Sequence, residues 1–89
     1  MVNDKLATQL VLDELFDLSL YREFAKIARP ETRVMFDELI PIEEKHLLFW
    51  QKFFKKENLQ ELNAARRIKL GILLFTARLF GEGAMHLIL

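Results

Sequence analysis

The chain has 89 residues, 13 basic and 13 acidic side chains, and no cysteine. Its length suits one domain, its zero net charge gives no electrostatic basis for binding nucleic acid, and the lack of cysteine excludes disulfides and thiolate metal sites. Hydrophobic residues make up 52% of the chain and include eight phenylalanines, more apolar surface than a small monomer readily buries, so we expect self-association. Few glycines and prolines, beside many leucines, glutamates, lysines and alanines, indicate an all-α protein.

The first predicted helix covers residues 4–29. Either Asn3 or Asp4 can cap its N-terminus, and Pro30 follows its end. The amphipathic pattern begins almost at the first residue, which is not typical of a secretory signal peptide. We therefore expect a cytoplasmic protein.

Glu14 is an acidic residue on an otherwise apolar side of this helix. It shares a line with small and aromatic residues spaced by seven, namely Ala7, Tyr21 and Ala28. A second apolar stripe consists of Leu12, Phe16, Leu20 and Ile27, so the helix should have neighbours on two flanks. Asp13 and Asp17 compete with Glu14 for the inward position, and Asp17 is the closer rival.

The second predicted helix, residues 31–57, carries two adjacent apolar seams. One seam consists of Phe36, Ile40, Glu43, Leu47, Trp50 and Phe54, and the other of Met35, Leu39, Ile42, His46, Phe49 and Phe53. Both follow the four–three spacing of residues on one side of a packed helix. Glu43 and His46 each occupy a place where a large apolar residue is expected, so both are predicted to point inward. The polar face consists of Asp37, Glu38, Glu44, Lys45, Gln51 and Lys52, which leaves Glu44 in water.

A buried carboxylate needs a partner, because removing it from water unpaired costs several kcal/mol or more. Glu43 and His46, three residues apart, can share one cation on the same side of the helix. Glu-x-x-His is also the spacing used by four-helix-bundle di-metal carboxylate sites, to which neighbouring helices add further glutamates. A buried Glu–His or Glu–Arg pair that fixes helix register without any metal is the alternative.

Pro41 lies within this second helix and predicts a kink or a local widening just before Glu43. A third helix is predicted over residues 59–80, with Arg66, Arg67 and Lys69 exposed, and glycines loosen the chain after it. Residues 70–89 are about long enough to span a membrane. Their charged residues, His86 and the pair Gly81 and Gly83 argue against a span, and burial between subunits is favoured.

The chain resembles the first helical pair of rubrerythrin-type ferritin-like proteins at Glu14, Tyr21, Phe36, the Glu43-x-x-His46 pair and Trp50. The segment 66–81 resembles the one that follows this pair in ferritin-like domains attached to vacuolar-iron-transporter-type membrane proteins. The resemblance implies a ferritin-like helical bundle with a di-iron centre. In that centre Glu14 would be a terminal carboxylate ligand, Glu43 a bridging one and His46 a terminal imidazole, while Tyr21 would support them by hydrogen bonding.

The resemblance also implies two such half-sites in one bundle, and this chain has one. Glu82 and His86 are spaced by four and flanked by glycine, so they do not repeat the motif. Either the chain is a fragment of a longer protein, or a second copy supplies the other half-site. We therefore expect a half-bundle of about three helices in one domain, residues 1–89, completed by homodimerisation or by a higher even oligomer.

Three functions follow as hypotheses. The first is a di-iron carboxylate protein, with manganese as the alternative metal, that oxidises Fe(II) with oxygen or peroxide. The second is a non-catalytic helical oligomerisation or interaction module. The third is a cytosolic iron-binding domain of a membrane iron transporter, in which a basic cluster faces acidic lipid; a solvated basic face is favoured over this membrane contact. That basic cluster consists of Lys52, Lys55, Lys56, Arg66, Arg67 and Lys69.

The metal site itself could be completed by a different carboxylate in place of Glu14. The candidates are Glu23, Glu38 and Glu44.

Overall fold

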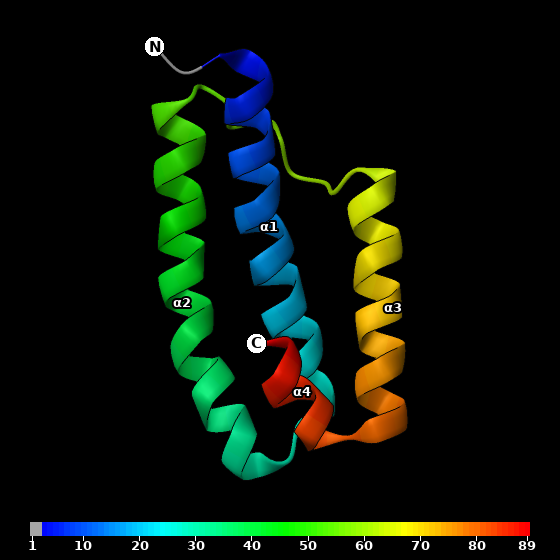
Figure 1. The fold of residues 1–89 in the computed structure, drawn as a ribbon. Coiled ribbons are helices and arrows are strands. Elements are labelled where there is room, and N and C mark those ends of the chain that lie inside the picture. The colour runs from blue at the N-terminus through cyan, green and yellow to red at the C-terminus, as the bar shows by residue number, and fades with distance from the viewer. Residues whose placement is uncertain (1–2) are drawn as a thin grey trace.

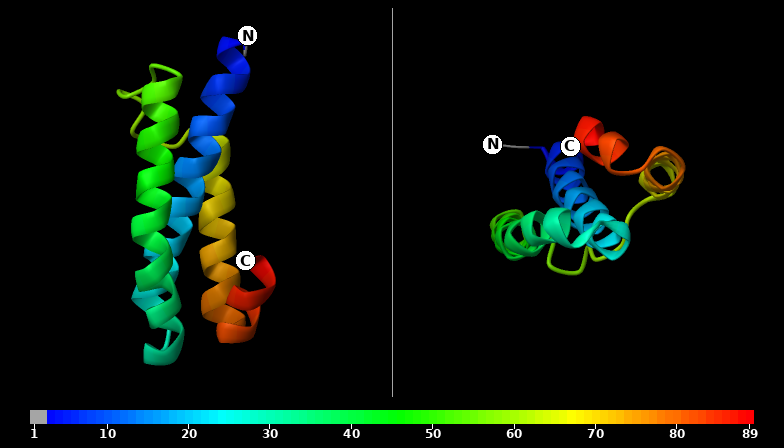
Figure 2. Two further views of the ribbon diagram at one scale, coloured as in Figure 1. Left: turned by 90° about the vertical axis from the view of Figure 1, so that its left-hand side faces the viewer. Right: turned by 90° about the horizontal axis from the view of Figure 1, so that it is seen from below.

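The computed structural model describes residues 3–89, and within that range the chain forms four helices and no strand. They are α1 (Asp4–Ile27), α2 (Pro30–Phe53), α3 (Ala64–Phe80) and α4 (Glu82–Ile88). The helix α1 lies between α2 and α3, and the short α4 lies across the lower part of α1 (Figures 1 and 2). The all-α prediction is confirmed.

Asparagine residues cap α1 and α3, and proline begins α2. The side chain of Asn3 accepts a hydrogen bond from the backbone N–H of Leu6 at 2.8 Å, which makes Asn3 the N-cap of α1. Pro30 begins α2, where its missing N–H is not needed. Asn63 caps α3 in the same way as Asn3 caps α1, by accepting from the backbone N–H of Arg66 at 3.0 Å.

The ends of the helices differ from the prediction. The first ends at Ile27 rather than 29, and the second at Phe53 rather than 57. Lys55 has a φ of 57°, in the left-handed region, which turns the chain out of α2. The third helix begins at Ala64 rather than 59, because residues 54–63 form a connection. Residues 82–88, expected to be loosened by glycine, form α4 after a turn at Gly81 (φ 77°).

The helix α2 continues through Pro41 without a break. Proline removes one backbone donor from the hydrogen-bond ladder, and the carbonyl four residues earlier is left without its partner. That carbonyl belongs to Asp37, an exposed residue, and Pro41 itself is exposed. Water can therefore satisfy the freed carbonyl, so the helix tolerates proline at this position.

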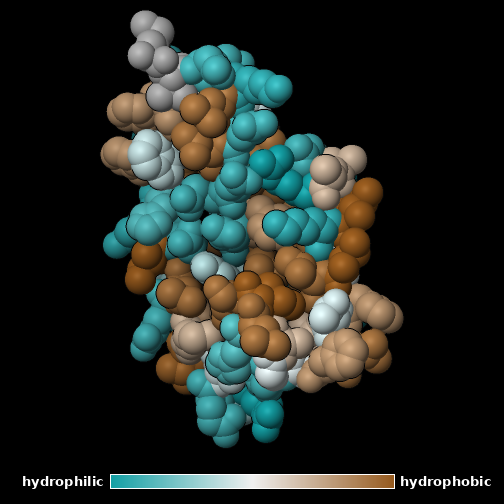
Figure 3. Space-filling view, in the orientation of Figure 1, coloured by the Kyte–Doolittle hydropathy of each residue, from teal (hydrophilic) through white to brown (hydrophobic). Residues whose placement is uncertain are grey.

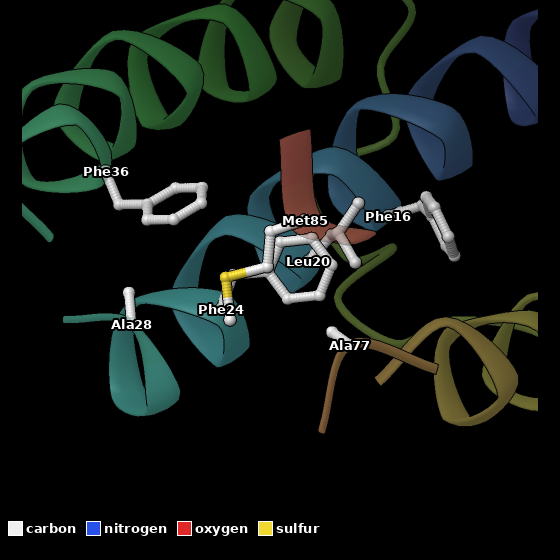
Figure 4. Packing of buried hydrophobic residues seen from close by; sticks show 7 residues of the cluster. All are labelled: Phe16, Leu20, Phe24, Ala28, Phe36, Ala77 and Met85. Atoms are coloured by element: carbon white, nitrogen blue, oxygen red, sulfur yellow. The ribbon is translucent and has the colours of Figure 1, made fainter. Parts of the chain in front are cut away.

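Two apolar clusters hold the helices together. The larger one consists of Phe16, Leu20, Phe24, Ala28, Phe36, Ala77 and Met85, drawn from all four helices and the turn after α1 (Figure 4). The rings of Phe24 and Phe36 pack edge to face, with centroids 5.9 Å apart. The second cluster, Val11, Leu15, Leu18 and Leu47, joins the upper parts of α1 and α2.

Several large apolar side chains of α2 and α3 remain on the surface. On α2 they are Val34, Ile42, Leu48, Phe49 and Phe53, and on α3 they are Ile68, Ile72, Phe75, Leu79 and Phe80. Hydrophobic atoms follow the outer edge of α3 on the right of Figure 3. Among residues 3–89, no helix combines the length and the apolar character that crossing a membrane requires.

Candidate metal centre

Glu14 of α1 and Glu43 and His46 of α2 meet at the interface between these two helices. Each offers one ligand atom that lies within 4.8 Å of the other two, and no other set of three or more acidic or histidine side chains in residues 3–89 comes together in this way. Atoms that share one ion at about 2.1 Å lie within about 4.2 Å of each other. Small side-chain rotations would therefore bring these three residues around one ion.

Glu43 is the most enclosed of the three. Its side chain is 16% exposed, and its Oε2 atom is buried without a hydrogen-bond partner among the described residues. Its Oε1 atom lies 3.6 Å from Nδ1 of His46. Buried polar atoms are nearly always satisfied by a hydrogen bond, a water or an ion. The unpartnered oxygen of Glu43 therefore fits a cation at this position.

Glu14 lies in a strongly acidic environment. Its pKa is raised from 4.5 to about 7, first by burial, then by the close approach of the Glu43 carboxyl group, and further by the negative charges of Glu43, Asp17 and Asp13. Burial and the charges of Glu43 and Asp13 also raise the pKa of Asp17, whereas Lys69 lowers it. Several negative charges therefore act on Glu14, and burial strengthens their effect.

His46 is placed differently from the prediction. Its side chain is 55% exposed, so the expectation that it points into the core is wrong for the single chain. Helical spacing puts it on the same side as Ile42 and Phe49, which are also exposed. Phe36 and Leu47 face α1 and are buried, whereas the other seam is exposed from Ile42 to Phe53, the part that contains His46.

Tyr21 lies about two turns after Glu14 on α1. Its ring packs near that of Phe36, with centroids 6.1 Å apart. Burial, followed by the charges of Asp17, Glu43 and Glu14, raises its pKa. Within residues 3–89 its hydroxyl makes no hydrogen bond, so the supporting hydrogen bond that the resemblance implies is not seen.

The competing acidic residues lie outside the group. Most of them have partners of their own: Asp13 binds Arg66, Glu23 binds Lys26, Glu44 binds Arg22, and Glu82 accepts from the backbone N–H of Arg29 at 2.6 Å. Glu38 and His86 are exposed. Glu44 pairs with Arg22 and keeps a side chain that is 45% exposed, and Glu82 with His86 lies at the α4 end of the molecule.

Lys69 of α3 is the feature near this group that the sequence did not reveal. Lys69 is exposed, as expected, but its Nζ also lies 5.0 Å from the centre of the Phe16 ring, and its charge lowers the pKa of Asp17. Arg66 also turns inward, and its Nη2 lies 2.7 Å from Oδ1 of Asp13. Both contacts cross from α3 to α1, and only the tertiary structure reveals them.

The raised pKa of Glu14 predicts how the metal-free protein responds to pH. Folded Glu14 keeps its proton up to about pH 7, whereas in the unfolded chain it releases the proton near 4.5. Protonated Glu14 therefore contributes stability below pH 4.5, and this contribution is lost as the pH rises towards 7. In urea unfolding of metal-free protein, wild type should lose stability relative to Glu14→Gln between about pH 5 and about pH 7.5.

The difference between wild type and Glu14→Gln isolates this group, because both proteins share every other titrating residue. A difference in unfolding free energy that is the same at both pH values would show that Glu14 does not titrate in this range.

Comparison with known proteins supplies no relative: no family model, curated protein or solved structure matches this chain.

Proposed function

We propose that this protein is a ferritin-like di-iron carboxylate protein that binds iron through Glu14, Glu43 and His46 and oxidises Fe(II) with oxygen or peroxide. The observation that carries the proposal is the convergence of one ligand atom from each of these residues to within 4.8 Å. Two carboxylates with one imidazole suit iron or manganese. A pair of iron ions would supply electrons to the oxidant by passing from the ferrous to the ferric state.

The ligand set supports a cation rather than a simple ion pair. The Glu43–His46 contact at 3.6 Å leaves the second oxygen of Glu43 without a partner, and Glu14 adds another carboxyl group beside it. One imidazole, largely in solvent, cannot neutralise both carboxylates. A divalent cation would satisfy the buried oxygen and relieve the repulsion between Glu14 and Glu43.

Three side-chain ligands do not fill the coordination shells of two metal ions, so we propose that a second copy of the chain supplies the other half. The seam that carries His46 is exposed and apolar, with Ile42, Phe49 and Phe53 beside it. A two-fold contact over this seam would bury it and bring two sets of Glu14, Glu43 and His46 together.

Aerobic titration with Fe(II), followed by the absorbance of ferric product, tests this function. Wild type should oxidise iron faster than buffer does, and the variant Glu43→Ala/His46→Ala should fall to the rate of buffer alone. The matched control is Glu38→Ala/His86→Ala, which removes the same two side-chain types from exposed positions outside the group and should behave as wild type. Equal oxidation rates in wild type and the Glu43/His46 variant would contradict the proposal.

Metal content per chain, measured beside native mass, tests whether the centre is shared. One metal per chain in an even-numbered oligomer is expected, and a metal-loaded monomer would contradict the sharing.

The exposed seam also supports the second hypothesis, an interaction module in which Glu43 and His46 select a helical partner. In that case, adding metal leaves the stability of the protein unchanged.

A further inference from the structure

A second apolar surface lies on the outer side of α3, away from the candidate metal centre. It consists of Ile68, Ile72, Phe75 and Leu79, spaced by four, three and four residues and each between 60% and 67% exposed. The opposite side of α3 carries Leu70, Leu73, Leu74 and Ala77, which pack into the larger core cluster. We call the exposed line of four residues the outer seam of α3.

The outer seam lies where a flat surface can reach it. The helix α3 is at one edge of the molecule, with α1 on its inner side and α2 beyond α1 (Figure 2). Hydrophobic atoms line this edge (Figure 3). Phe80, at the end of α3, is also strongly exposed, and so is Leu87 of α4. A plane that touches the outer seam would therefore meet α3 along its length without being blocked by α1 or α2.

The charges of α3 are all of one sign. Between residues 62 and 81 there are four basic residues and no acidic one, although the whole chain is neutral. Arg66 pairs with Asp13, and Lys69, although exposed, lies over the ring of Phe16 on the side of α3 that faces α1. Arg67 and Arg78 remain exposed, and their spacing of 11 residues puts them on one flank of the outer seam, about 16 Å apart.

A shallow hollow lies along this flank. It is lined by Gly71, Leu74, Phe75 and Arg78. Gly71 leaves open space in which a Cβ would meet nothing within 4 Å. Arg78 forms no ion pair with any residue from 3 to 89, and Arg67 pairs with Glu61, whose side chain is 83% exposed. The flank thus combines apolar walls with two guanidinium groups that an external anion can reach.

We propose that the outer seam of α3 binds a membrane surface rich in anionic lipid. The apolar side chains would enter the boundary between headgroups and acyl chains, and Arg67 and Arg78 would bind the acidic headgroups. A second copy of α3 fits this surface less well. Because α3 carries no carboxylate, pairing it with itself places basic residues beside basic residues without compensation.

Co-sedimentation with lipid vesicles tests the proposal. We expect the protein to bind vesicles of phosphatidylcholine containing phosphatidylserine, and to bind phosphatidylcholine alone much more weakly. Binding should weaken when the salt concentration rises from about 0.05 M to about 0.5 M, because exposed charges are then screened. Equal binding to both kinds of vesicle, or to neither, would overturn the proposal.

Two variants separate the contributions of charge and apolar contact. Arg67→Gln/Arg78→Gln should weaken binding to the anionic vesicles about fivefold for each arginine. Ile72→Gln/Phe75→Gln should lose most of the binding to the same vesicles. The controls remove the same kinds of side chain from α2: Lys45→Gln/Lys52→Gln for charge and Val34→Gln for exposed apolar area, and both should bind as wild type.

Each variant should keep its helical circular dichroism, because the changed side chains are exposed. Controls that weaken binding as much as the α3 variants would overturn the assignment to α3. The native mass measured without lipid tests whether a second copy of the chain covers the outer seam instead. If Ile72→Gln/Phe75→Gln divides a larger oligomer into smaller ones, the outer seam is an interface between copies and the proposal is wrong.

Discussion

Divalent metal should raise the thermal unfolding midpoint of the protein by roughly 15 °C. A ligand that binds only the folded state stabilises it by about 2.7 kcal/mol when its free concentration is about 100 times its dissociation constant. For a domain of this size, 1 kcal/mol shifts the midpoint by about 4–8 °C. The stabilisation arises because the cation satisfies the buried oxygen of Glu43 and separates the carboxyl groups of Glu14 and Glu43. Manganese(II), followed by circular dichroism, avoids oxidation during heating.

The metal-dependent shift, rather than the absolute midpoint, is the quantity to compare between variants. Glu43→Ala/His46→Ala should lose the shift, and Glu38→Ala/His86→Ala should keep it, since its residues lie outside the group. Equal shifts in both variants would place the metal elsewhere on the protein. A shift that survives in the absence of measurable iron oxidation would support metal binding and contradict catalysis.

Phe36→Ala should destabilise the protein by about 4 kcal/mol, a large part of the stability of a small domain. The side chain of Phe36 is 0% exposed and packs against Phe24 and Tyr21, with ring centroids 5.9 Å and 6.1 Å away. Truncation would leave a cavity between α1 and α2 in the larger core cluster. Urea unfolding should therefore show a midpoint well below that of wild type.

Phe75→Ala is the matched control for this core substitution. It deletes the same atoms from the outer seam of α3, where the ring is 67% exposed. Substitutions at the surface usually change the free energy of unfolding by no more than about 0.5 kcal/mol. If Phe36→Ala lost no more stability than Phe75→Ala, Phe36 would not be a core residue.

Helical spacing predicted the contact side of α2 correctly. Phe36 and Leu47 are buried, and Glu43, on the same line, is largely enclosed. Its pairing with Glu14 was implied by the resemblance to ferritin-like proteins, whereas helical spacing alone left Asp17 as a rival. The inferences from spacing hold because residues three or four apart share one side of a helix, whatever the helix packs against.

The exposure of His46 could not be predicted in this way. Spacing shows which residues share a side, but not whether a neighbour covers that side. Gln51 is the opposite case, a residue predicted to be exposed that another segment of the chain buries. It was assigned to the polar face, yet it is 2% exposed because residues 54–63 fold back over it, and its Nε2 donates to the carbonyl of Leu59 at 3.0 Å.

Helix ends were the least predictable feature of the fold. Lys55 leaves α2 through the left-handed region, which glycine or asparagine would have signalled and lysine does not. Asn63 carried a recognisable capping signal for α3 that the apolar pattern before it obscured.

The arrangement of the helices has a consequence for how the molecule opens. The helix α1 packs against α2 far more extensively than against α3, and only Ala28 and Arg29 connect α1 to α2. The first two helices therefore form a local hairpin that can fold early, while α3 and α4 form a separate cooperative unit of lower stability. The backbone amides of α3 and α4 should exchange their hydrogens with solvent through partial opening, at a time when the amides of the α1–α2 hairpin remain protected.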